Sequence, residues 1–305
     1  HGEWYRYHHL FRDVLRLRLQ QTQAELIPIL HQRASVWHQA QGLLDEAIEH
    51  ALAAQDLQRA GDLIVGAFLP LWKRSALGLL RRWVESLPEA AFHQHADLAF
   101  WSSALFAYTG RLDEAEKRLE LAEALFQAPP AGHDSLPDPT SRLGRVAWLR
   151  GMLAARRGAV AQAQELAEQA FALLPADDLA FRGGTFIILG LAQLMRGDLV
   201  AAQQAYEQAA QLARATEHWF LLSGALGRLA PIQMTLGRLR ATAASCRQLL
   251  ALPVVQHGRL PAAGYAHVAL AEVYYQWNEL ATAAQQAETG ADQAVKPRFF
   301  EVQAA

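Results

Sequence analysis

The chain has 305 residues with a formal charge of -2, and 52% of the residues are apolar, which is enough for a large core. This charge balance excludes a global field that would attract nucleic acid or an anionic membrane, and no apolar run approaches the ~18 residues that a membrane-spanning helix needs. The one cysteine, Cys246, excludes an internal disulfide and fits a reducing compartment, so we expect a cytoplasmic protein without membrane contact.

The first predicted element covers residues 1–19, where aromatic and basic residues crowd together before an amphipathic helix. Helical spacing places Leu10, Val14 and Leu17 inward, and it turns the basic side chains outward, namely Arg6, Arg12, Arg16 and Arg18. A solvated face or a domain contact is the favoured interpretation of these arginines, and a wing that contacts DNA is the alternative. The stretch has neither a signal-peptide layout nor an initial methionine, so we expect an excised piece of a longer protein.

From residue 20 onward, the chain repeats a short pattern of Gly, an aliphatic residue two positions later and an Ala near the fifth position. We interpret each copy as the turn between two antiparallel helices, because Gly or Asn tolerates the left-handed conformation that ends a helix. The copies start at Gly42, Gly110, Gly158, Gly197, Gly237 and Asn278, with a degenerate one at Gly78.

Small residues at a fixed distance before five of these turns support the same interpretation. Two helices can cross closely only where the side chain at the crossing is small. The residues at these positions are Ser103, Gly151, Gly190, Ala230 and Ala271. Pro88, Pro175 and Pro253 are expected to stop second helices before the next unit. Helix-forming residues dominate the composition, and β-branched alternation is nearly absent. The sequence therefore predicts an all-α fold, a right-handed superhelical α-solenoid.

The pattern resembles the tetratricopeptide repeat, although the later copies lie 39 to 41 residues apart and the family period is about 34. We expect a repeat domain over residues 20–305, with about seven helix pairs across residues 20–290 and an eighth unit that starts at residues 297–305 and is truncated. The longest gap between turns holds a segment rich in Pro and Gly, residues 127–140, which predicts a surface loop. A tolerated insertion is favoured there, and a functional lid is the alternative.

The opening line "EWYRYHHLFRDVLRLRL" and the first repeat, residues 30–64, resemble MalT-like, LuxR-type transcriptional activators of the STAND ATPase class. In that family, a winged-helix element ends in a similar line and runs directly into helical repeats. The resemblance is strong over residues 1–90, and it divides the chain into the end of the winged helix, residues 1–19, and the repeat domain, residues 20–305. It is carried by Trp4, Tyr7, His8, Leu10, Phe11, Arg12, Trp37, Gly42, Glu46, Ala47, His50, Ala51, Trp83, Leu87 and Pro88.

This resemblance implies a parent protein with an ATP-binding switch, a winged helix and a C-terminal helix-turn-helix that binds DNA, and it allows self-association of that parent. The chain itself has no G-x-x-x-x-G-K-[ST] loop and no basic recognition face. We therefore expect no enzyme activity and no cofactor in this fragment, with ATP bound only elsewhere in the parent and DNA contacted only through a missing C-terminal domain.

Two functions are consistent with this organisation. The leading hypothesis is a sensor domain that binds a small-molecule inducer or a regulatory protein and thereby controls the attached ATPase switch and DNA-binding domain. The alternative is a generic tetratricopeptide scaffold that binds peptide segments of partner proteins. A lysine-rich carboxylate clamp would favour the scaffold, but the few lysines, Lys73, Lys117 and Lys296, lie outside the predicted groove positions.

The predicted ligand site is the groove formed by the first helices of the units. By analogy with tetratricopeptide repeats, residues three before and one after each small position face this groove, where aromatic rings could stack on a sugar or grip a peptide. The candidates are Phe100, Arg145, Trp148, Met152 and Tyr265, and the same phase adds Ala104, Arg156, Ile187, Leu191, Gly227, Pro231, Val268 and Glu272. Simple packing between units is the alternative for Trp148 and its neighbours.

Three other features are weaker candidates for chemistry. Adjacent histidines such as His8 and His9 point about 100° apart on a helix, so they cannot easily ligate one metal ion. The run "HQHAD", residues 93–97, is more consistent with an exposed turn between units than with a zinc site. Cys246 is expected inside the second helix of the sixth unit, as a buried core thiol rather than a nucleophile.

Overall fold

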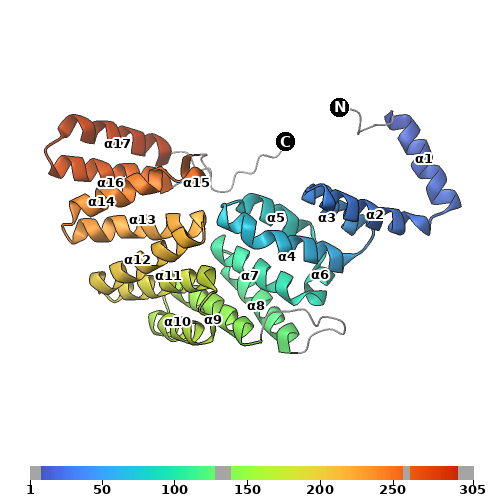
Figure 1. The fold of residues 1–305 in the computed structure, drawn as a ribbon, viewed down its shortest axis with the longest axis horizontal. Coiled ribbons are helices and arrows are strands. Elements are labelled where there is room, and N and C mark those ends of the chain that lie inside the picture. Colours follow the sequence, from blue (N-terminus) through green and yellow to red (C-terminus); the bar gives the residue numbers. More distant parts are fainter. Residues whose placement is uncertain (1–7, 128–138, 257–261, 295–305) are drawn as a thin grey trace.

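The computed structural model describes residues 8–127, 139–256 and 262–294, and these ranges are built from helices and short turns (Figure 1). After a separate first helix, α1 (His9–Thr22), the chain forms successive helix pairs joined by tight turns. The pairs in the described part are α2 (Leu26–Ala40) with α3 (Leu44–Ala53), α4 (Leu57–Lys73) with α5 (Leu77–Ser86), α7 (Ala96–Tyr108) with α8 (Leu112–Gln127), α9 (Pro139–Arg156) with α10 (Val160–Leu173), α11 (Leu179–Met195) with α12 (Leu199–Ala215), α13 (Trp219–Thr235) with α14 (Leu239–Leu250), and α16 (Ala262–Gln276) with α17 (Leu280–Ala294).

Two short helices, α6 (Glu89–Gln94) and α15 (Pro253–Gln256), connect neighbouring pairs. The second helices α5, α10 and α14 end just before Pro88, Pro175 and Pro253, as predicted. None of the helices that the structure describes has the length and apolar character needed to cross a membrane. The predicted loop at residues 127–140 falls almost wholly outside the described residues, as do Arg6 and the predicted eighth unit.

The turns within the pairs share one geometry. Gly42, Gly110, Gly158, Gly197 and Gly237 have φ between 71° and 85°, and Asn278 has φ of 60°, so all six predicted turn residues are left-handed. In each case the next residue donates a backbone hydrogen bond to a carbonyl five positions back, as Arg111 does to Phe106 at 2.9 Å. This arrangement is the Schellman motif, in which a left-handed residue and the bond that follows it close the end of a helix.

The prediction of a turn at Gly78 was wrong. Gly78 lies inside α5, and the turn of that unit is at Ser75, with φ of 58°. Gln55 and Glu217, with φ of 57° and 51°, make equivalent turns between pairs. The same five-residue backbone bond closes all three, for example from Ala76 to Leu71 at 2.9 Å. A non-glycine residue is tolerated there because the hydrogen bond and the packing of the following helix offset the steric cost of positive φ.

The predicted close crossings are confirmed at Gly151 and Gly190. A Cβ added to Gly190 would lie 2.7 Å from the ring of Tyr206 on α12, and one on Gly151 would lie 3.3 Å from the Cβ of Leu166 on α10. At Ser103 the small side chain has a second role, because its hydroxyl donates to the carbonyl of Ala115 at 2.5 Å. Ser35 makes the equivalent bond to Ala47 at 2.7 Å, so the same pair of positions joins α2 to α3.

The array curves so that first helices of distant units meet. α7 is buried along nearly its whole length and forms the centre of the first half. The N-terminal end of α13 approaches the C-terminal end of α4 across the inside of this curve, as Figure 1 shows, although these helices belong to units far apart in the sequence. We call the side of the array inside this curve the inner face.

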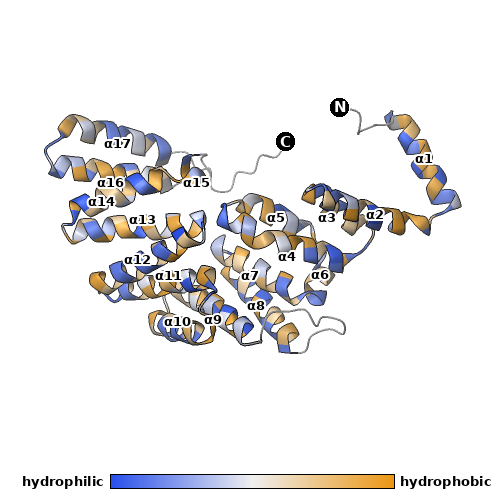
Figure 2. Ribbon diagram, in the orientation of Figure 1, coloured by the Kyte–Doolittle hydropathy of each residue, from blue (hydrophilic) through white to orange (hydrophobic). Residues whose placement is uncertain are grey.

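The predicted burial of the apolar residues of α1 was wrong. Leu10, Val14 and Leu17 are 63%, 61% and 55% exposed. Figure 1 shows α1 projecting away from the helix pairs, and Figure 2 shows apolar and polar residues alternating along it. Helical spacing did separate the two kinds of residue, but nothing in the described part of the chain covers the apolar side.

Candidate functional site

The inner face carries a continuous cluster of aromatic side chains from five first helices. α4 and α7 supply stacked rings, with the Phe68 and Trp101 centroids 4.8 Å apart. α9 and α11 extend the cluster through Trp148 and Phe181, whose rings meet edge to face at 5.0 Å. We define the aromatic cluster as Phe68, Trp72, Phe100, Trp101, Tyr108, Trp148, Phe181 and Phe220.

Phe220 closes this cluster from the opposite side. It lies in the first turn of α13, and its ring centroid is 5.2 Å from that of Tyr108 and 6.0 Å from that of Trp72. Edge-to-face pairs at such distances contribute about 0.5–1.5 kcal/mol beyond their buried area. Phe220 therefore connects α13 to α4 and α7, which belong to units that are not its neighbours in the stack.

A cavity of about 30 Å³ remains between Trp72, Trp148, Phe181, His218 and Phe220. This volume is enough for about one water molecule. Trp148 is 5% exposed, and its indole N–H has no hydrogen-bond partner among the residues that the structure describes. The indole fits because Gly184 lines the same cavity without a side chain, since a Cβ there would lie 2.6 Å from Nε1 of Trp148. A buried donor without a partner is uncommon in native proteins, which makes this cavity the main candidate site.

His218 lies at the rim of the cavity as the N-cap of α13. Its Nδ1 accepts a hydrogen bond from the backbone N–H of Leu221 at 3.3 Å, which leaves the proton of the neutral ring on Nε2. Burial lowers the pKa of His218 to about 4, and the nearby positive charge of Lys73 contributes in the same direction. The imidazole is therefore neutral at pH 7 and can serve as a hydrogen-bond donor.

Arg145 flanks the cluster one turn before Trp148. Its guanidinium lies 4.7 Å from the centre of the Phe181 ring and donates to the carboxylate of Asp178 at 3.0 Å. Asp178 immediately precedes α11, so this ion pair fixes the start of α11 against α9. The pair also neutralises a charge next to the apolar rings.

The structure brings together four of the five predicted site residues. Phe100, Trp148 and Met152 are buried in the same core, with Arg145 beside it, whereas Tyr265 is 76% exposed on α16 and is not part of the cluster. The prediction lacked Phe181, His218 and Phe220. The adjacent glycines at residues 183–184 were an available signal, because paired glycines inside a helix indicate close approach of other groups.

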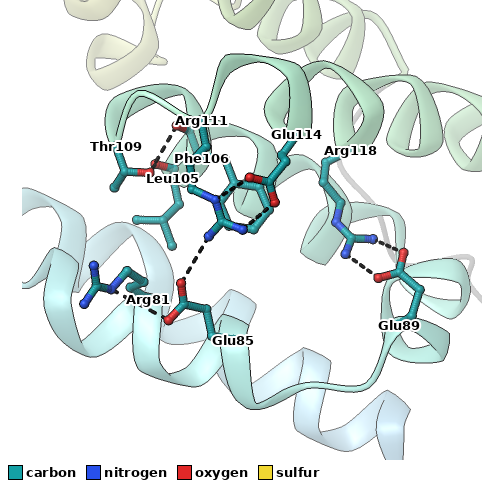
Figure 3. Close-up of polar contacts among 9 residues, drawn as sticks. All are labelled: Arg81, Glu85, Glu89, Leu105, Phe106, Thr109, Arg111, Glu114 and Arg118. Carbon is teal, nitrogen blue, oxygen red and sulfur yellow. Dashed lines mark hydrogen bonds and ion pairs between the residues drawn. The ribbon is translucent and has the colours of Figure 1, made fainter.

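The outer face, formed by the second helices, is built differently. Arg111 pairs with Glu85 at 3.1 Å and with Glu114, and Arg118 makes two bonds to Glu89 at 2.5 and 2.6 Å (Figure 3). Arg157 of the next unit pairs with Glu116 and Asp113 on α8 at 2.5 and 3.2 Å. The grooves between these helices are therefore bridged by matched charges.

The weaker candidates from the sequence have structural roles. Cys246 is fully buried in α14, as predicted, and burial raises its pKa to about 11. His95, expected in an exposed turn, is instead buried as the N-cap of α7 and contacts the carboxylate of Asp62 at 3.0 Å. Gly61 makes room for this ring. No group of three or more metal-ligating side chains occurs among the described residues.

The fold defines a tetratricopeptide-like protein, an array of paired helices with a lined inner face. It is similar to the crystal structure of a Rap protein complexed with Competence and Sporulation Factor, with a TM-score of 0.55 at 15% identity, covering 92% of this chain and 78% of that one.

Sequence comparison then gives the family. The MalT-like TPR region matches residues 144–303, and the MalT winged helix domain matches residues 1–27. The chain belongs to the family of MalT-like TPR regions. It is 29% identical over 290 residues to the HTH-type transcriptional regulator MalT of Yersinia enterocolitica and 28% identical over 292 residues to that of Yersinia pestis. Each alignment covers 95% of this chain and 32% of the relative, so the chain spans about a third of these regulators.

Proposed function

We propose that this chain is the sensor region of a transcriptional regulator, and that a small-molecule inducer binds at the aromatic cluster on its inner face. The observation that carries the proposal is the unpartnered indole N–H of Trp148 beside the cavity. A ligand oxygen placed there would satisfy a buried donor that lacks a partner in the described part of the chain.

Binding requires the cavity to open, because about 30 Å³ holds only a water molecule. The mobile element in our proposal is the contact of Phe220 with Trp72 and Tyr108, since it joins units that are otherwise separate. A ligand that replaces Phe220 between these rings would change the curvature of the array. In the longer protein, this change would reach an ATPase switch and a DNA-binding domain, while the chain itself catalyses no reaction.

The matched pair Trp148→Phe and Trp277→Phe tests this function. Trp148→Phe keeps one aromatic ring but removes the N–H together with part of the indole's volume. Trp277→Phe makes the same change at the end of α16, outside the cluster, and therefore controls for the lost volume. Metabolites are screened for a rise in the melting temperature of the wild-type chain. We expect any stabilising metabolite to lose its effect with Trp148→Phe and to keep it with Trp277→Phe. Metabolites that stabilise all three proteins equally would contradict the assignment, as would nucleotide hydrolysis by the purified chain.

A regulatory protein is the second candidate partner, and the last described unit supports it. Tyr265, Val268 and Tyr275 are 76%, 53% and 62% exposed along one face of α16. Exposed aromatic rings on one helix face are typical of protein-binding surfaces. A protein partner of this kind would lose affinity on Tyr265→Ser and would be insensitive to Trp148→Phe.

A further inference from the structure

Arg156 extends the cavity-lining face of α9 toward one end of the groove. Trp148, Met152 and Arg156 are spaced four residues apart, so they lie along one face of the helix. The guanidinium carbon of Arg156 is 5.4 Å from the centre of the Tyr108 ring on α7. Arg156 keeps part of its surface exposed to solvent, while its guanidinium group packs close enough to the protein for burial to affect it.

Arg228 lies in the middle of α13. It follows Phe220 and Gly224 at the same four-residue spacing, and its one hydrogen bond in the described residues goes to the carbonyl of Gly224 at 2.9 Å, within its own helix. Phe220 touches Tyr108. Burial raises the pKa of Tyr108, and the positive charges of Arg156 and Arg228 both oppose that rise. Arg156 of α9 thus packs over the Tyr108 ring, and Arg228 follows on the same helix as Phe220, which packs against that ring from α13.

No carboxylate balances these two charges in the described part of the chain. Neither Arg156 nor Arg228 takes part in an ion pair there, and the hydroxyl of Tyr108 has no hydrogen-bond partner among the same residues. Burial lowers the pKa of Arg156, and the nearby charge of Arg228 lowers it further. Two like charges close together are unfavourable unless an anion joins them.

We propose that Arg156, Arg228 and the hydroxyl of Tyr108 bind the carboxylate or phosphate group of a small ligand whose apolar part packs against Phe220 and Trp148. This inference rests on the proposed function and assigns its ligand to the class of apolar or aromatic anions. Guanidinium groups and a phenol all donate hydrogen bonds, and guanidinium geometry matches carboxylate and phosphate oxygens. The aromatic cluster beside them supplies the surface for an apolar body.

Three small probes test the assignment on the 305-residue chain, with tryptophan fluorescence as the readout and constant ionic strength. Phenyl phosphate and benzoate carry the two candidate anionic groups, and benzyl alcohol is a neutral analogue. We expect saturable binding of at least one anion, about tenfold or more weaker with Arg156→Gln and with Arg228→Gln. Whichever anion binds more tightly identifies the group as phosphate or carboxylate.

Arg240→Gln is the matched control, because Arg240 is exposed on α14 and makes no ion pair in the described residues. This variant is expected to bind the anions as the wild type does. An equal loss with Arg240→Gln, unchanged affinity in both inner-face variants, or no saturation by either anion overturns the anion site. Benzyl alcohol binding as tightly as the anions, with sensitivity to Trp148→Phe alone, overturns it too but leaves the proposed function intact.

Discussion

Arg156 and Arg157 are neighbours in the sequence, but they lie on different faces of the array and in different electrical surroundings. Arg157 pairs with Asp113 and Glu116 on the outer face. Arg156 points to the inner face, where its guanidinium carbon lies 5.4 Å from the centre of the Tyr108 ring and the positive charge of Arg228 lowers its pKa. Paired charges connect successive units, whereas unpaired charges next to aromatic rings are typical of a binding surface. Under the proposed function, the outer face holds successive units together and the inner face recognises the ligand.

The largest effect is expected from adding bulk to the inner face. Gly184→Leu would place side-chain atoms where Nε1 of Trp148 lies only 2.6 Å from an ideal Cβ, so the free energy of unfolding should fall by about 3 kcal/mol. Gly66→Leu is the control, because Gly66 is exposed within α4 with no atom within 4 Å of its Cβ position. Urea denaturation measures both. Equal stability of the two variants would contradict the close packing of the inner face.

An effect of about the same size is expected from the pH dependence of stability. His218 takes up a proton near pH 6.5 in the unfolded chain, but in the fold its pKa is lowered to about 4. The unfolded state therefore binds more protons between these values, so the stabilisation is complete above pH 6.5 and is lost as pH falls toward 4. The loss is about 3 kcal/mol. His218→Asn keeps an acceptor for the cap without a titrating ring, and it should flatten this part of the profile. An unchanged profile would show that other groups cause the dependence.

The smallest effect is expected on the outer face. Glu89→Gln removes the carboxylate that Arg118 holds with two bonds, but Glu89 is exposed, and the stacking of Arg118 over Phe92 at 3.8 Å remains. The free energy of unfolding should fall by less than about 1 kcal/mol, and the difference should shrink in high salt. A loss as large as that of Gly184→Leu would remove the distinction between the two faces.

The turns could be predicted from the sequence where the turn residue is of a type that favours positive φ. Gly158 and Gly197 were predicted as turns because glycine commonly adopts positive φ. The equivalent turn at Glu217 was not predicted, because glutamate rarely adopts positive φ. The close crossing at Gly190 was predicted from its position within the repeat unit, because the two helices can approach closely there only if the residue has no side chain.

The site was predictable only in part. Trp148 was identified from its offset from the small residue of its unit, because each first helix presents the same positions to the groove. This rule did not predict Phe220 or His218, since their contacts with α4 and α7 depend on how small rotations between successive units add up over the whole array. It also placed Tyr265 in the groove, although the curve carries α16 away from the cluster.

The bridge made by Phe220 has a consequence for folding. In a linear repeat array each unit contacts only its neighbours, so the units can open one after another from either end. Here α13 is tied to α4 and α7, and the helices between them form a closed circuit of contacts. Opening any unit in that circuit strains the tie, so α4 to α13 should exchange their amide hydrogens as one cooperative block. The helices beyond it, α16 and α17, remain free to fray on their own.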